Sequence, residues 1–437
     1  MFADFYRTHK HFVFVAIIWL LLGRFVSPLT QLAIILSLLL FISKDKVAFM
    51  LFGLFLLLYF SDSYLAQFSF AKPIKPYYLL GIGAAFFLGR NELRQGSTFY
   101  FVFLPFLTFA FLVIGKSEMP KFALQKTISY LLLVILVPNI TLRLFKEYGP
   151  AIFKQFIVLI TLFLLVAIVF RLAGISMVGL NRFHGFLGNP NAIGLNCTTF
   201  FVFFLVVKQY FPQLFSRQEN LIIYAIIAYS CIESGSRNAI FSITLFLIVS
   251  RFFKFSQVLG MIILLVGALT YEVVVDYSHV LIQQMGLSSF LRENTLESGS
   301  GRLVAWKFGW EQIQLNFFFG KGLGHEEYIY YHEGNQQMLN LMGSDGGAHN
   351  SFISIWLSTG LFGLVLFMYA LISKFVIAAK NTFIALPILA MILFSAFFES
   401  WLIGSLNPYT ILILMSLTIM TSHEFNKEKP QGSFSIL

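Results

Sequence analysis

The sequence predicts an all-α, polytopic membrane protein with about 12–14 transmembrane helices, because each crossing of the bilayer needs roughly 20 mostly apolar residues. Two observations support this fold class: the composition and a series of long apolar runs. Of the 437 residues, 58% are hydrophobic and only 11% are charged. A soluble domain has about 25% charged residues. The composition therefore excludes a soluble globular protein.

Apolar runs recur along almost the whole chain, and short polar connections separate them. The run that begins at Pro76 is interrupted by this proline and by glycines, which favours a partial span and a total nearer to 12. The candidate spans cover residues 11–24, 26–43, 47–62, 76–90, 98–115, 127–142, 152–172, 190–207, 219–234, 238–252, 257–274, 349–373, 380–398 and 405–421.

One connection, residues 275–348, is much longer than the others and carries more acidic than basic residues. An apolar run with helical period, 303–319, follows the sequence Ser298-Gly299-Ser300-Gly301, so we expect a helical loop. Lysine and arginine in the short connections predict that both termini are cytoplasmic and that this loop is extracytoplasmic. The expected organisation is N-terminal transmembrane helices over 1–274, the large loop over 275–348, C-terminal transmembrane helices over 349–421 and a cytoplasmic tail over 422–437.

The formal net charge of +10 does not indicate nucleic acid, because the basic residues are scattered between apolar runs and form no stripe. The two cysteines, Cys197 and Cys231, lie in apolar segments and form neither a disulfide framework nor a metal quartet. The histidines and acidic residues lack the spacing of a zinc or carboxylate metal site. We therefore expect no nucleic-acid partner and no metal ion.

Polar residues gather at the ends of spans, and the predicted topology places these clusters on the extracytoplasmic side. Arg237 is the most informative, because an arginine at the mouth of a span is costly unless it snorkels, pairs or serves a site. Ser234, Gly235 and Ser236 leave room for a ligand, and Glu233 is in sequence range to orient the guanidinium. An interfacial anchor is the alternative.

Two further arginines, Arg182 and Arg302, are predicted on the same side. A guanidinium can grip two oxygens of a diphosphate at once, which a lysine cannot do. A contact with lipid headgroups is the alternative for Arg182, and a solvated charge at a helix start is the alternative for Arg302. The segment from Gly320 to Gly324 is similar to part of a phosphate loop, but no strand precedes it, so we interpret it as a turn.

His349 stands directly before a predicted span, next to Gly346, Gly347 and Asn350. Histidine titrates near neutral pH and can accept a proton from a hydroxyl nucleophile. The alternative is a capping or headgroup-facing residue. Trp306 and its aromatic neighbours can offer flat faces to sugar rings, although packing at the membrane interface explains them almost as well.

Taken in order over about residues 150–375, these motifs resemble the O-antigen ligase and O-antigen polymerase superfamily of membrane glycosyltransferases. The motifs are Arg182-Phe183-His184-Gly185 with Gly188-Asn189-Pro190-Asn191, Ser236-Arg237, Gly301-Arg302 with Trp306, Gly320-Lys321-Gly322-Leu323-Gly324, and His349-Asn350 followed by Gly360-Leu361-Phe362-Gly363-Leu364.

The resemblance implies a GT-C-like glycosyltransferase of the bacterial inner membrane, with its active site on the periplasmic side and with neither a metal nor a nucleotide sugar. It implies an undecaprenyl-diphosphate-linked oligosaccharide as donor and an inverting reaction. By the same resemblance, Arg237 and Arg302, together with Arg182, hold the diphosphate, while His349 deprotonates or orients the acceptor hydroxyl. Asn350 and Trp306 are expected to contact substrate.

Polymerase and ligase differ in the acceptor, which is a second lipid-linked repeat unit for the first and the lipid A core of lipopolysaccharide for the second. The 54 phenylalanines of the chain and its weakly patterned N-terminal half favour the divergent polymerase branch. A chain-length regulator protein is a further partner that the resemblance to this superfamily implies. Two other classes stay open: a small-solute transporter, which usually binds its substrate near the membrane midplane, and a scaffold for envelope assembly.

Overall fold

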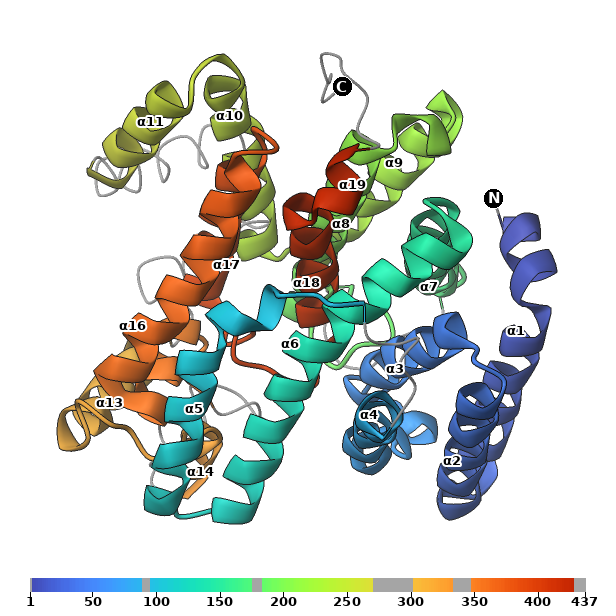
Figure 1. The fold of residues 1–437 in the computed structure, drawn as a ribbon, viewed down its shortest axis with the longest axis horizontal. Coiled ribbons are helices and arrows are strands. Elements are labelled where there is room, and N and C mark those ends of the chain that lie inside the picture. Colours follow the sequence, from blue (N-terminus) through green and yellow to red (C-terminus); the bar gives the residue numbers. More distant parts are fainter. Residues whose placement is uncertain (1, 89–94, 175–182, 270–301, 333–346, 428–437) are drawn as a thin grey trace. The chain divides into compact units, whose positions relative to one another are not determined.

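The computed structural model describes residues 2–88, 95–174, 183–269, 302–332 and 347–427 (Figure 1). Within these ranges the chain consists of helices and short connections. The described β-type pairing is an isolated bridge between Ser63 and Leu187. The prediction of an all-α protein is confirmed.

Every predicted span coincides with a described helix, because a chain in lipid must satisfy its backbone hydrogen bonds internally. In α5 the helix is extended by the 3₁₀ turns η3 and η4. The helices are α1 (Phe2–Phe25), α2 (Ser27–Ser43), α3 (Val47–Ser61), α4 (Ala71–Phe87), η3 (Phe99–Val102), α5 (Leu104–Leu112), η4 (Val113–Lys116), α6 (Pro120–Tyr148), α7 (Ala151–Leu172), α8 (Pro190–Tyr210), α9 (Arg217–Ser234), α10 (Arg237–Phe255), α11 (Gln257–Leu269), α16 (Ser351–Ala379), α17 (Ala385–Phe398) and α18 (Pro408–Thr421).

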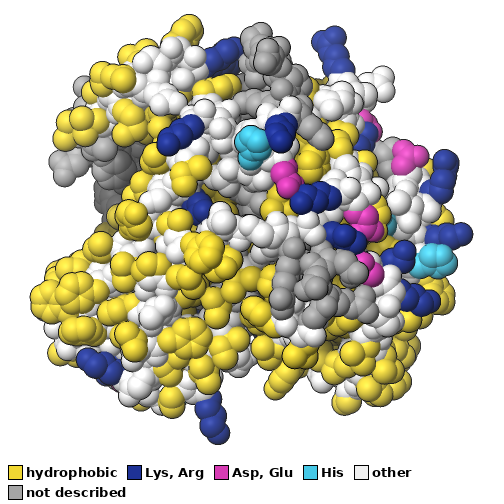
Figure 2. Space-filling view, in the orientation of Figure 1, with side chains coloured by type: hydrophobic (Ala, Val, Ile, Leu, Met, Phe, Trp, Pro, Cys, Tyr) yellow, Lys and Arg dark blue, Asp and Glu magenta, His cyan; other side chains and the backbone are white. Residues whose placement is uncertain are grey.

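The length and composition of these helices confirm a polytopic membrane protein. Among the described residues, six helices are long and apolar enough to cross a membrane: α1, α6, α7, α8, α10 and α16. Six shorter apolar helices accompany them: α2, α3, α5 with η4, α11, α17 and α18. Figure 2 shows hydrophobic side chains over much of the visible face, as expected for helices that contact lipid.

The chain divides into two compact units. The first consists of residues 1–100, 129–236 and 405–437. Its centre is α8, which packs against α7, α9 and α18 and whose side chains are buried almost all round. A helix that is apolar on every face is expected to occupy such a central position.

The second unit consists of residues 101–128 and 237–404, so it contains the described part of the long loop. This part forms α13 (Arg302–Leu315) and α14 (His325–His332). Both helices pack against α16, and α10 packs against α17. Ala305, Ile313, Ile329 and Leu357 share an apolar core there. The expected helix in this loop is confirmed, although it ends at Leu315 and not at Phe319.

A backbone break in α16 anchors the loop. At Gly360 the backbone has φ 65° and ψ −177°, so the helical hydrogen bonds are interrupted. The loop supplies replacements: Gly322 N–H donates to the Ser358 carbonyl at 2.7 Å, and Leu361 N–H donates to the Phe317 carbonyl at 2.8 Å. A Cβ atom at Gly360 would lie less than 3.0 Å from the Phe318 carbonyl. Gly320, Gly322 and Gly324 all have positive φ, which confirms that their segment is a turn.

Candidate active site

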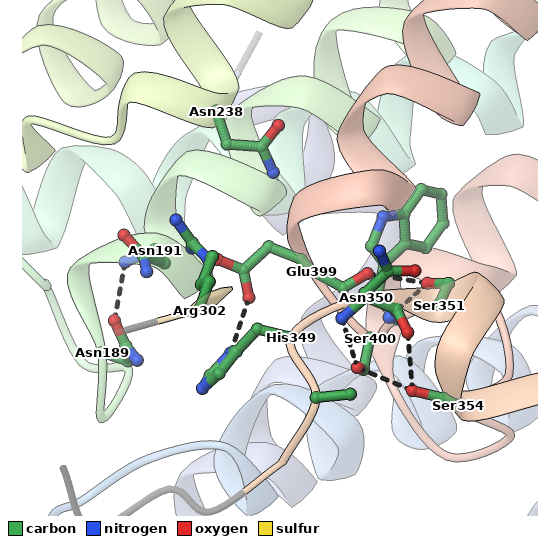
Figure 3. Close-up of polar contacts among 12 residues, drawn as sticks. Asn189, Asn191, Asn238, Arg302, His349, Asn350, Ser351, Ser354, Glu399 and Ser400 are labelled. Atoms are coloured by element: carbon green, nitrogen blue, oxygen red, sulfur yellow. Dashed lines mark hydrogen bonds and ion pairs between the residues drawn. The ribbon is translucent and has the colours of Figure 1, made fainter. Parts of the chain in front are cut away.

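Two of the predicted site residues, Arg302 and His349, meet at a single carboxylate in the second unit. Arg302 Nη2 lies 2.7 Å from Glu399 Oε1, and His349 Nδ1 lies 3.4 Å from Glu399 Oε2. Figure 3 shows both side chains directed at Glu399. Arg302 begins α13, His349 stands two residues before α16, and Glu399 follows α17. The fold therefore assembles this group from three segments that are far apart in sequence.

The group is partly buried, which strengthens its electrostatic interactions. The exposed fractions of the side chains are 16% for Arg302, 14% for Glu399 and 22% for His349. Burial lowers the pKa of His349, but the hydrogen bond and the negative charge of Glu399 outweigh it, so the pKa is raised overall. Arg302 acts in the opposite direction on the same imidazole. When Nδ1–H donates to Glu399, Nε2 of the neutral ring is left as the basic nitrogen.

The backbone at His349 is unusual because its φ is 47°. This left-handed conformation is uncommon for a residue other than glycine and marks a position that the surrounding structure must hold. On the C-terminal side, Asn350 caps α16: its Oδ1 accepts hydrogen bonds from the N–H groups of Phe352 at 2.9 Å and Ile353 at 3.1 Å. Asn350 thus fixes the helix start beside His349, and its contact with substrate stays a prediction.

Trp306 also acts on the peptide beside His349. Its Nε1–H donates to the Ala348 carbonyl at 2.9 Å, and its ring packs edge-on against Phe397 at 5.0 Å between centroids. Trp306 therefore connects α13 to both α17 and the segment that carries the histidine. Stacking of this ring on a sugar stays a prediction.

Arg237 is the first residue of α10 in the same unit. The next residue, Asn238, donates from Nδ2 to the Ser395 carbonyl at 3.2 Å. Since Ser395 lies in the last turn of α17, the start of α10 packs against the helix end that leads to Glu399. Glu233, which the sequence offered as a partner for Arg237, lies in the first unit with its carboxylate 3.9 Å from Arg171.

Three residues of the Arg182–Asn191 motif, His184, Asn189 and Asn191, belong to the first unit. Arg182 lies outside the described residues. Asn189 caps α8 by accepting from Asn191 N–H at 2.8 Å. His184 is buried, and its Nδ1 lies 3.0 Å from the Leu187 carbonyl.

Sequence reasoning missed three polar residues of this group: Glu399, Ser400 and Glu326. Glu399 and Ser400 stand in the short connection between α17 and α18, which the predicted topology puts on the same side as His349. An acidic residue that ends a long uncharged run was the available signal. Glu326 gave no comparable signal, because several acidic residues surround it in the loop. Its side chain is only 7% exposed, and burial raises its pKa.

Comparison with known families identifies the region that holds most of this group. Residues 222–368 match a family model described as O-antigen ligase. The matched segment contains Arg237, Arg302 and His349, whereas Glu399 lies beyond it. The match confirms the resemblance to the O-antigen ligase and polymerase superfamily. No curated protein matches the chain. Members of the family are glycosyltransferase-like membrane enzymes.

Proposed function

We propose that this protein is an O-antigen polymerase that transfers a glycan from undecaprenyl diphosphate to a lipid-linked repeat unit. The arrangement of Arg302 and His349 on the two oxygens of Glu399 carries the proposal. Glycosyl transfer from a diphosphate needs a cation where the leaving group departs and a base where the acceptor hydroxyl attacks. Arg302 supplies the cation and His349 supplies the base, and both side chains contact the carboxylate of Glu399.

The reaction we propose is a single displacement at the anomeric carbon. The acceptor oxygen forms the new glycosidic bond, the bond to the diphosphate oxygen breaks, and undecaprenyl diphosphate leaves. The hydroxyl proton passes to His349, whose Nε2 is basic when Nδ1–H faces Glu399. Arg302, with Arg237 from α10, stabilises the charge that grows on the diphosphate. One preorganised donor of this kind typically contributes about 100-fold to 1000-fold in rate. The step requires neither a metal nor a nucleotide sugar.

Glu399 couples the two halves of this reaction. Before the donor binds, Arg302 and His349 share its charge. A diphosphate carries more charge than one carboxylate and competes for the guanidinium fork. Once Arg302 turns to the diphosphate, Glu399 interacts with His349 alone and holds the base more firmly. Donor binding therefore prepares the base for the acceptor.

The acceptor distinguishes the polymerase from the alternative, an O-antigen ligase. The decisive experiment uses purified protein in proteoliposomes with an undecaprenyl-diphosphate-linked repeat unit as the only glycan. A ladder of lipid-linked products is expected, and the His349→Ala variant should not form it. A requirement for lipid A core as acceptor would identify a ligase instead. In cells, deletion of the gene should leave one repeat unit on the core, whereas bare core would again indicate a ligase.

The proposed reaction takes place on the periplasmic side of the bacterial inner membrane. Tyr331 is 77% exposed and stands in α14, so it reports on the side that the loop faces. In a background with Cys197 and Cys231 replaced by serine, Tyr331→Cys should react with an impermeant maleimide in intact spheroplasts. Lys44→Cys, between α2 and α3, should react only after lysis. The reverse pattern would contradict the proposed location.

A further inference from the structure

Glu326 links the two segments that present His349 and Glu399. Its Oε1 accepts hydrogen bonds from Ala348 N–H at 2.7 Å and from Ser400 Oγ at 3.1 Å. Ala348 directly precedes His349, and Ser400 directly follows Glu399. A single oxygen of α14 therefore holds the backbone beside the imidazole and the side chain beside the carboxylate.

The surrounding hydrogen bonds make this junction stiff. Ser400 Oγ accepts from Asn350 N–H at 2.9 Å and lies 2.8 Å from Ser354 Oγ. Ser351 Oγ donates to the Glu399 carbonyl at 2.7 Å. The N–H groups on both sides of His349 are thus fixed, one by Glu326 and the other by Ser400. Such fixation from both sides is what a left-handed histidine requires.

A role in packing alone does not explain a carboxyl group at this place. Burying a carboxyl is costly unless hydrogen bonds compensate, and an apolar side chain would fill the same space without that cost. The compensation that Glu326 receives comes from the two segments that carry His349 and Glu399. Glu327, the next residue, shows the contrast: its side chain is 49% exposed and pairs with Lys126 of α6.

We propose that Glu326 is a positioning residue, which sets His349 and Glu399 at the distance that the transfer reaction needs. The inference rests on the proposed function, because it assigns Glu326 to that same site. Through this contact α14, a helix of the long loop, controls the geometry of the base. Glu326 touches no reacting atom, and it positions His349 and Glu399 through its hydrogen bonds to Ala348 and Ser400.

The test compares kcat and KM for transfer by Glu326→Ala, Glu326→Gln and the matched control Glu327→Ala. We expect Glu326→Ala to lower kcat about tenfold to 100-fold, with KM for the lipid-linked donor changed less than about twofold, because misplacement of the base affects the transition state more than binding. Glu326→Gln should recover most of the activity, since an amide oxygen accepts the same two hydrogen bonds. Glu327→Ala should match the wild type.

A kcat for Glu326→Ala equal to that of the wild type, or an equal loss in Glu327→Ala, would overturn the proposal. Ser400→Ala is a second variant that keeps the proposal testable if Glu326→Ala fails to fold. It removes the hydrogen bond from Ser400 Oγ to Glu326 and leaves the buried carboxyl group in place. The two substitutions should be partly non-additive, since both remove the hydrogen bond between Glu326 and Ser400, although Glu326 also binds Ala348 N–H and Ser400 also binds Asn350 N–H; fully multiplicative losses would also overturn the proposal. Absence of glycan transfer by the wild type would instead refute the proposed function itself.

Discussion

Asp45 and His349 are the non-glycine residues with positive φ in the described part of the chain, at 50° and 47°. At Asp45 the local turn accounts for the conformation. Asp45 N–H donates to Ile42 and Lys46 N–H donates to Phe41, so the residues after α2 form a Schellman motif. Aspartate is also among the residues that enter this region most readily.

Within the described residues 347–427, His349 makes no comparable hydrogen-bonded turn. Distant side chains hold its two neighbours: Glu326 binds Ala348 N–H, and Ser400 binds Asn350 N–H. Backbone strain that a local turn explains does not indicate a functional role. Backbone strain that tertiary contacts maintain points to a functional site. Both residues also belong to ion pairs, Asp45 with Arg143 and His349 with Glu399. An ion pair is therefore common to Asp45 and His349. What distinguishes the two residues is the origin of their backbone conformation, which is a local turn at Asp45 and tertiary contacts at His349.

The largest difference is expected in activity. His349→Ala should lower the rate of glycan transfer about 1000-fold or more, because the proton acceptor is removed, and loss of such a group costs about 4 kcal/mol of transition-state stabilisation. Asp45→Ala should stay within about twofold of the wild type, since it disturbs only a turn and a half-buried ion pair of the first unit. Transfer in proteoliposomes measures both, with protein amount and membrane insertion as controls. Equal losses of activity in His349→Ala and Asp45→Ala would contradict the functional difference between the two positions.

Glycines with positive φ allow the same comparison for stability. Gly149 (φ 62°) follows α6 and has open space around its Cα, whereas Gly360 (φ 65°) is in contact with the Phe318 backbone. Alanine at Gly149 bears the positive-φ penalty of about 1–2 kcal/mol, and alanine at Gly360, where ψ is −177°, enters a region that is essentially restricted to glycine and costs about 1–3 kcal/mol. Gly360→Ala additionally forces the loop and α16 apart, so it should destabilise the protein by about 2 kcal/mol more than Gly149→Ala. Thermal unfolding in detergent measures this difference, and equal shifts would mean that the loop does not depend on the break.

The helices could be predicted because the bilayer permits little else. An apolar run in lipid must form a helix, so composition and run length located the apolar helices of the described residues, and their ends differ from the predicted ends by only a few residues in most cases. The break at Gly360 was not predictable, since a helical run with one glycine usually continues. Only the backbone of residues 317–322 explains it, and this partner is remote in sequence.

The site was predicted in part. Arg302 and His349 carry a chemistry that is readable from residue type and position at a span end. Glu399 acts through contacts with those two residues. Glu326 and Ser400 bind the N–H groups beside His349, and such contacts have no sequence pattern. Asn350 and Trp306 were predicted as substrate contacts, and the structure adds a positioning hydrogen bond for each. Hydrogen bonds to the main chain depend on tertiary distance, which spacing along the chain does not reveal.

The pH dependence of transfer tests the electrostatic side of the comparison. Glu399 raises the pKa of His349, while Arg302 acts against it and Glu326 supports it. Since the base must be neutral to accept a proton, wild-type activity falls as the pH drops below this raised pKa. Glu399→Gln removes the negative charge, lowers the pKa and should move the acid limb to lower pH. The plateau should fall about tenfold, because the imidazole is less well oriented. An unchanged acid limb would show that another group controls it.

The smallest effect is expected where strain is only local. Asp45→Gly relieves the left-handed penalty of about 1 kcal/mol, but it loses the pair with Arg143 and gives the unfolded chain more freedom. These terms nearly cancel, so the free energy of unfolding should change by less than about 1 kcal/mol. His349→Gly relieves the same strain and should be equally mild for stability, yet it should abolish transfer. Thermal unfolding and transfer assays on the same preparations separate the two. A large loss of stability in Asp45→Gly would mean that tertiary contacts hold this turn as well, because a Schellman turn tolerates glycine at that position.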